Sequence, residues 1–200
     1  MGQYSQDREI IMSNMLNYSQ LVFFDTETTS LDSNKGEIIS VCVMTEDSNG
    51  KLSTWQTKIM PRLKKGSYSQ RALDINGFSL EEWKGAPKFE DIATDLVWKM
   101  RFGPIIAHNA QFDVNFIQTE LNRCGWKPGY KTDVVSKQYR LGYPVIDTVA
   151  LSWLCLPTEK QNLNVLREHI GIDTSRAHRA DTDVEDTRVV FWKCVQKLLL

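Results

Sequence analysis

Apolar residues run without interruption from Leu21 to Phe24, and acidic and hydroxyl residues follow them in the segment LVFFDTETTSLD. A short continuous apolar run that ends in polar residues is typical of a buried strand in an α/β protein. Residues 37–44 and 51–59 have the pattern of two further strands, and the Asn-Gly pair between them is a strong hairpin signal. We therefore expect the first three strands to form an antiparallel meander.

Apolar residues spaced three and four apart predict helices in the rest of the chain. These helices cover residues 89–100, 111–124, 149–154, 163–170 and about 180–200. Short apolar segments at 105–107 and 145–146 precede two of them and are interpreted as buried strands. Residues 61–79 are interpreted as a loop. Residues 1–18 form an N-terminal extension without an assigned function, ahead of one α/β domain at 19–200.

The composition is that of one globular domain, because 42% of the 200 residues are hydrophobic and 24% are charged. The four cysteines lie far apart and form no Cys-x-x-Cys pair, which argues against a structural zinc site or a disulfide framework. The N-terminus lacks the apolar run of a secretory signal, and no stretch is long enough to cross a bilayer. We expect a reduced, cytoplasmic protein without a membrane partner.

The net charge of −1 disfavours a polyanionic partner at first sight, but a bound divalent cation reverses the sign of the local charge. Charge is also distributed unevenly along the chain. Between residues 123 and 140 one acid, Asp133, stands among five basic residues: Arg123, Lys127, Lys131, Lys137 and Arg140. Two interpretations of this basic cluster stay open, a solvated loop and a contact with a nucleic-acid backbone.

Asp25 and Glu27 follow the first predicted strand directly. Residues two apart in an extended chain share one face, so both carboxylates project together. Like charges on one face of an apolar element repel each other and are costly to bury unless a cation lies between them. Oxygen ligands favour the hard cations Mg²⁺ and Mn²⁺. The alternative interpretation is an acidic loop at the end of a strand.

Two further acids lie at the ends of predicted elements. Asp113 falls in the first turn of helix 111–124, and Asp183 lies near the start of the last helix. Four converging carboxylates match a site in which two cations, roughly 3.5 to 4 Å apart, clamp the attacking and leaving oxygens of a phosphoryl transfer. His178 titrates near neutral pH and could take the proton from an attacking water. Taken alone, Asp183 is more simply a helix-dipole acid and His178 a surface residue, but their spacing with the earlier acids favours a site.

Three segments, LVFFDTETTSLD, IIAHNAQFDVNF and HRADTD, resemble the motifs of a known family. They are similar to the three motifs of the DEDD, or DnaQ-like, 3′→5′ exonucleases, in the DEDDh subgroup with a histidine in the third motif. This family includes the proofreading subunits of bacterial replicative polymerases. The weaker landmarks YPVIDTVAL and NLNVLREHIGI come in the expected order. The resemblance spans residues 21–200 and implies a ribonuclease-H-like fold, a mixed five-stranded sheet flanked by helices.

Carried over by position, the resemblance implies a site for two ions of Mg²⁺ or Mn²⁺. Asp25, Glu27 and Asp183 would hold one cation, and Asp25 together with Asp113 would hold the second. His178 would be the general base. All five residues would then be catalytic.

The resemblance also implies contacts with the substrate. Leu31 matches a position where the family places an apolar residue against the terminal base. Thr28 and Thr29 would offer hydroxyls and backbone amides to the terminal nucleotide. Asn109, in the second motif, is a candidate substrate contact, although a role in fixing the turn before the helix is favoured. Asp147 is interpreted as a helix cap and not as a ligand.

The sequence departs from the family pattern in two places. Ser30 stands where the family usually has glycine, so the turn after the first motif is expected to differ slightly, and with it the fit of the terminal sugar. The second departure follows the last helix, where we expect none of the extra module that ties many proofreading subunits to a polymerase.

The implied reaction is hydrolysis of the terminal phosphodiester of single-stranded or frayed DNA 3′ ends, with release of nucleoside 5′-monophosphates. Its setting would be proofreading in DNA replication, with a polymerase or another replication protein as a possible partner. An RNA-trimming 3′→5′ exoribonuclease stays open, because the motifs show no recognition of a 2′-hydroxyl. A non-catalytic nucleic-acid-binding scaffold is disfavoured because all four acids and the histidine are present. The His-x4-Asp spacing disfavours an endonuclease.

Overall fold

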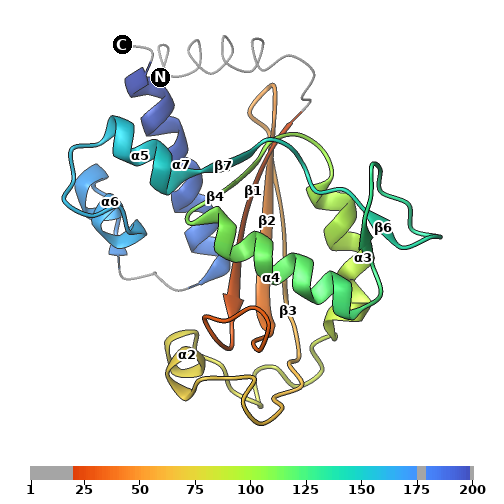
Figure 1. Cartoon of the computed structure of the whole chain (residues 1–200). Helices are drawn as coiled ribbons and strands as arrows, with labels where there is room; N and C mark the ends of the chain where they lie inside the picture. The colour runs from red at the N-terminus through yellow and green to blue at the C-terminus, as the bar shows by residue number, and fades with distance from the viewer. Residues whose placement is uncertain (1–19, 175–178, 199–200) are drawn as a thin grey trace.

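The computed structural model describes residues 20–174 and 179–198, which fold into a mixed sheet with helices on both faces (Figure 1). The strands of the main sheet are β1 (Gln20–Thr28), β2 (Ile38–Asp47), β3 (Leu52–Lys58), β4 (Ile105–Ala107) and β7 (Val145–Asp147). The helices are α2 (Gln70–Ile75), α3 (Phe89–Met100), α4 (Ala110–Arg123), α5 (Thr148–Cys155), α6 (Leu163–Ile170) and α7 (Ala180–Leu198). A separate small sheet pairs β5 (Lys127–Pro128) with β6 (Gln138–Tyr139).

The main sheet has the order β3-β2-β1-β4-β7. Its first three strands are the predicted antiparallel meander, and β4 and β7 join parallel to β1 and to each other. β4 pairs with β1 at Val22 and Phe23 and ends at Ala107, whereas β1 continues to Thr28. The last part of β1 therefore extends past β4, where the first turn of α4 can reach its backbone.

Alternate residues of β1 contribute to two hydrophobic cores on opposite faces of the sheet. Val22 and Phe24 belong to the core under α3 and α4. Leu21 and Phe23 belong to the core under α7, on the other face of the sheet. Because side chains alternate along a strand, Asp25 and Glu27 continue the α7 face. The sequence pattern that builds the core thus decides which helix the acids meet.

A buried polar contact anchors α7 to the sheet. The Glu46 side chain on β2 is fully buried, and Arg188 Nε and Trp192 Nε1 of α7 donate to its Oε2 at 2.7 and 2.9 Å. Leu166 of α6 packs with Val190 of α7 in a further hydrophobic cluster. The start of α7 packs against β1 through Ala180 and Val184, and the ion pair with Glu46 joins the helix to β2.

The predictions and the structure differ in three places. β1 extends to Thr28, beyond the apolar run that predicts the strand, because its polar residues still pair with β2. The interpretation of 61–79 as a loop is wrong for α2, a six-residue helix that buries only Leu73 and so has no apolar period. The two-residue strands β5 and β6 are too short to give a pattern.

The other helix boundaries follow from local signals. Asp147 caps α5, because its side chain accepts from Val149 N at 2.9 Å, as predicted. Asn162 caps α6 in the same way, and Gly171 ends it with a φ of 77°. Among the described residues, we find no helix with the length and apolar character to cross a membrane.

Replacing Phe23 with alanine should lower the free energy of unfolding by about 3–5 kcal/mol. The Phe23 ring is fully buried and packs edge-on against Phe191, with 5.6 Å between ring centroids, so its loss leaves a cavity between β1 and α7. Urea denaturation followed by circular dichroism measures the change. Val135→Ala is the control, because Val135 is 96% exposed and should change stability by less than about 0.5 kcal/mol. Equal effects of the two substitutions would contradict the assigned core.

Candidate active site

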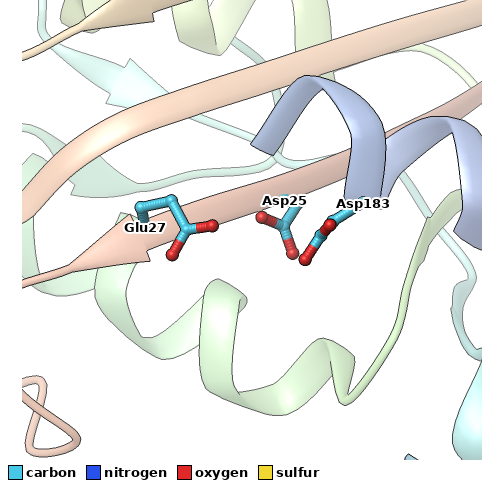
Figure 2. A group of neighbouring side chains, drawn as sticks. All are labelled: Asp25, Glu27 and Asp183. Atoms are coloured by element: carbon cyan, nitrogen blue, oxygen red, sulfur yellow. The ribbon is translucent and has the colours of Figure 1, made fainter. Parts of the chain in front are cut away.

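Three carboxylates converge where β1 meets the start of α7. One oxygen from each of Asp25, Glu27 and Asp183 lies within 4.8 Å of the other two. Figure 2 shows Asp25 and Asp183 side by side, with Glu27 further along β1 on the same side of the strand. Asp183 lies in the first turn of α7, where the helix dipole favours a negative charge. The predicted convergence of these three residues is therefore present.

Asp113 approaches the same part of β1 from α4. It lies in the first turn of α4, is 2% exposed, and accepts from Thr26 N at 2.9 Å and from Thr26 Oγ1 at 2.6 Å. Both bonds end on Oδ1, which fixes this carboxylate against the part of β1 that extends past β4. Asp113 is outside the group of three within 4.8 Å, but its charge acts on Asp25 and Glu27.

Burial and mutual repulsion favour protonation of these acids. Burial raises the pKa of Asp25 well above its ordinary value, and the charges of Asp113, Glu27 and Asp183 raise it further. Burial, followed by the charges of Asp183 and Asp113, raises the pKa of Glu27 to about 7. Burial raises the pKa of Asp113 to about 7 against the opposing hydrogen bonds from Thr26. Near neutral pH the isolated site is therefore only partly ionised.

The donor set fits a divalent cation. Clustered carboxylate oxygens with raised pKa values are unfavourable by themselves, and a cation between them removes both the repulsion and the tendency to protonate. Carboxylate oxygen is also the donor that hard divalent cations prefer. Asp25, Glu27 and Asp183 are thus suited to hold such an ion.

Arg167 is a site residue that the sequence interpretation missed. It lies on α6 with 1% of its side chain exposed, and its Nη2 donates to Asp183 Oδ1 at 2.6 Å. A signal was present, because Arg167 lies four residues after Leu163 and three before Ile170, on the apolar side of a helix interpreted as an ordinary amphipathic one. A charged residue at such a position needs a buried partner.

At the turn after β1, the polar groups of Thr28 and Thr29 form hydrogen bonds within the protein. Thr28 Oγ1 donates to Ser30 O at 2.8 Å, and Thr29 Oγ1 donates to Ser67 O at 2.7 Å. Thr29 N donates to Glu37 O, and Thr29 is fully buried. These contacts support the turn after β1. Contact of Thr28 and Thr29 with the terminal nucleotide stays a prediction.

Leu31 and Ser30 complete this turn. The Leu31 side chain is 88% exposed and is thus accessible to a base, as its predicted role requires. At Ser30, where the family usually has glycine, the side chain is accommodated by Gly36, because a Cβ on Gly36 would lie 2.8 Å from Ser30 Cβ. The expected difference in the turn is therefore a close approach between these two positions.

The predicted turn role of Asn109 is consistent with its backbone. Asn109 has a φ of 66°, a left-handed conformation that asparagine tolerates, and its N–H donates to Asp147 Oδ1 at 3.0 Å. Asp147 Oδ2 also accepts from Ala110 N, so one carboxylate joins the starts of α4 and α5. A substrate contact by the exposed Asn109 side chain stays a prediction. His178, the predicted general base, lies outside the residues that the structure describes.

A groove of about 640 Å³ begins beside Glu27. The sheet contributes Ser40 and Lys58 to its walls, and the start of α7 contributes Asp181. Asn76, at the end of α2, forms another wall, and its Nδ2 donates to Thr28 O at 2.9 Å. The helix that the sequence interpretation missed is therefore fastened to the end of β1 and shapes the space next to the carboxylates.

The basic cluster at 123–140 divides into two parts. Arg123 donates to Glu120 and to the backbone oxygens of residues 33, 34 and 36, so it stabilises the turn after β1. Lys137 Nζ donates to Cys124 O. Lys127, Lys131 and Arg140 are exposed, and for them the contact with a nucleic-acid backbone stays a prediction.

The sheet order β3-β2-β1-β4-β7, with helices on both faces, defines the class of ribonuclease-H-like folds. A family model described as Exonuclease (RNase_T) matches residues 22–191, and the chain belongs to this exonuclease family. The predicted family is thereby confirmed. Assignment to the DEDDh subgroup stays a prediction, since it depends on His178.

Curated relatives carry this domain as part of longer proteins. The 3′-5′ exonuclease DinG of Staphylococcus haemolyticus is 30% identical over 184 residues, which cover 91% of this chain and 19% of DinG. The PolC-type DNA polymerase III of Oceanobacillus iheyensis is 28% identical over 179 residues, which cover 89% of this chain and 12% of the polymerase. DNA polymerase III subunit epsilon of Treponema pallidum is 29% identical, with 80% of this chain and 69% of the subunit covered. The chain thus spans less than a fifth of the first two proteins.

Solved structures share the fold. A crystal structure of E. coli Exonuclease I in complex with a dT13 oligonucleotide matches with a TM-score of 0.73 at 17% identity, over 90% of this chain and 42% of that one. A product-bound structure of exonuclease I matches with a TM-score of 0.71 at 16% identity, over 91% and 44% of the two chains. The predicted mixed five-stranded sheet flanked by helices is confirmed.

The metal-free protein should lose stability as the pH rises from about 5 to about 7. The folded-state pKa of Glu27 is about 7, above its ordinary 4.5, so the folded protein binds this proton more tightly than the unfolded chain does. That stabilising contribution is complete below pH about 4.5 and is lost as the pH rises through about 7. A divalent cation should reverse the loss, because it favours the ionised form.

Melting temperatures measured in chelator across this pH range test the prediction. The Glu27→Gln variant is the control, because it cannot titrate at this position and should show a shallower pH dependence. The same pH dependence of the melting temperature in the variant and the wild type would show that the pKa of Glu27 is not raised in the folded protein.

Proposed function

We propose that this domain is a divalent-metal-dependent 3′→5′ exonuclease that acts on single-stranded or frayed DNA and releases nucleoside 5′-monophosphates. The observation that supports this most directly is the convergence of Asp25, Glu27 and Asp183 in a chain of the exonuclease family. The direction of cleavage is supported by the name of the relative DinG. The substrate is supported by the oligonucleotide bound to Exonuclease I.

In this proposal two ions of Mg²⁺ or Mn²⁺ occupy the site. Asp25, Glu27 and Asp183 hold one, and Asp25 with Asp113 holds the other. When bound, such ions stabilise the charge that develops on the phosphoryl oxygens and favour the ionised form of the attacking water. Asp113 is suited to its part because the two bonds from Thr26 fix its carboxylate at the strand.

The side chains around the carboxylates bind the 3′ end and move a proton. The terminal nucleotide occupies the groove beside Glu27, whose wall includes Lys58 in an ion pair with Glu82. Leu31 presents an exposed apolar surface to the terminal base. Stacking on such a surface tolerates any base. His178 takes the proton from the attacking water. The product leaves with a 5′-phosphate, since the water attacks the phosphorus and the 3′ oxygen of the preceding nucleotide departs.

A role in DNA replication and a cytoplasmic location are part of the same proposal. Their support is the similarity to DNA polymerase III subunits. A polymerase or another replication protein would be the partner of the domain, as the names of these relatives indicate. If RNA is the better substrate, the domain is an RNA-trimming enzyme and not a proofreading one.

Asp25→Asn should abolish shortening of a 5′-labelled single-stranded DNA from its 3′ end. The wild type should give a ladder in Mg²⁺ or Mn²⁺ and no products in chelator. The variant should stay folded, with an unchanged or higher melting temperature in chelator, because the substitution removes charge repulsion from a crowded site. Asp95→Asn, on the exposed side of α3, is the matched control and should keep full activity.

A matched RNA oligonucleotide in the same assay separates the two substrate classes. Faster shortening of RNA would make the domain an exoribonuclease. Full activity of Asp25→Asn would refute the proposed site. Intact binding without cleavage of either nucleic acid by the wild type would indicate a scaffold.

His178→Asn should reduce the turnover number by roughly 10²- to 10⁴-fold while metal binding changes little, because a general base acts on water and not as a ligand. Single-turnover kinetics at saturating Mn²⁺ measure the effect. His169→Asn is the control, since His169 is exposed at the end of α6 and has no assigned role. An unchanged rate in His178→Asn would assign proton transfer to another group.

A further inference from the structure

Arg167 connects the proposed metal site to the layer of helices behind it. Its Nη2 donates to Asp183 Oδ1 at 2.6 Å, its Nε donates to Asp186 Oδ2 at 2.7 Å, and its Nη1 donates to Asn164 Oδ1 at 2.7 Å. The three nitrogens of one guanidinium thus contact three side chains. Two of these belong to α7 and lie on successive positions of one helix face, Asp183 and Asp186.

Burial restricts the orientation of the Arg167 guanidinium. The Arg167 side chain is 1% exposed and that of Asp186 is 3% exposed, whereas Asp183 is 13% exposed, at the edge of the site. A guanidinium is planar and rigid, so two parallel contacts to α7 determine its orientation. A buried ion pair is a weak source of stability, because desolvation offsets the attraction. The geometry therefore needs an explanation other than net stabilisation of the fold.

The three proposed ligands of the first ion differ in how they are held. Asp25 and Glu27 share the backbone of β1, which pairs with β2 along its length, so their spacing is set by the strand. Asp183 comes from a different element, and its position depends on α7 and on the torsions of its own side chain. A ligand must be held to within about 0.5 Å of its position to bind a metal well. The residue that holds the ligand therefore also contributes to the metal affinity.

We propose that Arg167 is a positioning residue that orients the Asp183 carboxylate toward Asp25 and Glu27 for binding of a divalent cation, and that Asp186 holds Arg167 in place. This inference rests on the proposed function, because it takes Asp183 to be a metal ligand. It assigns to α6 a direct part in the site, beyond covering the hydrophobic core around Val190. Arg167 itself contacts neither metal nor substrate in this arrangement.

Charge and orientation predict opposite effects when Arg167 is changed. Removing a positive charge beside the carboxylates would by itself strengthen their attraction for a cation. Loss of orientation would weaken it. The sign of the change in metal affinity therefore decides between a positioning residue and a counter-ion that competes with the metal.

The experiment measures Mn²⁺ binding to the full chain by isothermal titration calorimetry without nucleic acid. Arg167→Lys keeps the charge but loses the planar fork, and should weaken Mn²⁺ binding by about 10-fold or more. Arg167→Gln removes the charge as well and should also weaken binding. Asp186→Asn leaves Arg167 in place but loosens its support, so a smaller loss of several-fold is expected.

Arg188→Lys provides the matched control. Arg188 lies on α7, as Asp183 and Asp186 do, and forms an ion pair with the fully buried Glu46 of β2 further along that helix. Both arginine variants should lower the melting temperature, but Arg188→Lys should leave Mn²⁺ affinity within twofold of the wild type. In cleavage assays Arg167→Lys should need more Mn²⁺ for half-maximal activity and should recover most of its turnover at saturating Mn²⁺.

Unchanged or tighter Mn²⁺ binding by Arg167→Lys and Arg167→Gln would overturn the inference and leave the proposed function intact. If Arg167→Lys does not fold, unchanged Mn²⁺ affinity in Asp186→Asn would overturn it equally. Failure of the proposed function has a different result, in which the wild type does not bind Mn²⁺ or binds it as well after Asp183→Asn.

Discussion

Electrostatic repulsion among buried carboxylates is the constraint on which this structure depends. Asp25 and Glu27 lie close to Asp183, and Asp113 approaches the free edge of the same strand from α4. Burial is the largest cause of the raised pKa values of Asp25 and Glu27, and the neighbouring carboxylate charges raise both pKa values further. The apolar interior must supply the free energy that keeps them together, and a cation is the natural way to release the opposing force.

The scaffold meets this requirement with rigid elements. β1 has neighbours on both edges in its first half and is packed by helices on both faces, so it cannot shift to separate the acids. α7 is fixed by the Glu46 contact in its second half and by Arg167 near its start. Asp113 uses the backbone of β1 as its own support. The packing and the ion pairs that hold β1 and α7 thus keep the mutually repelling carboxylates close together.

The sequence was most informative where one strong local pattern decided the outcome. The apolar run before Asp25, the alternation that places Glu27 on the same face and the amphipathic last helix with Asp183 all predicted their structure. Prediction failed where tertiary contacts decided. α2 is fastened to the end of β1, and Arg167 is explained only by acids on a helix further along the chain.

The close approach of Ser30 and Gly36 has a consequence for how the first motif can vary. A Cβ at position 36 would lie 2.8 Å from Ser30 Cβ, 3.1 Å from Phe116 Cε1 and 3.2 Å from the backbone oxygen of Asp32. Substitutions at positions 30 and 36 are therefore interdependent: loss of the serine side chain would relieve the tightest of the contacts that alanine at 36 makes, whereas the contacts with Phe116 and Asp32 would remain.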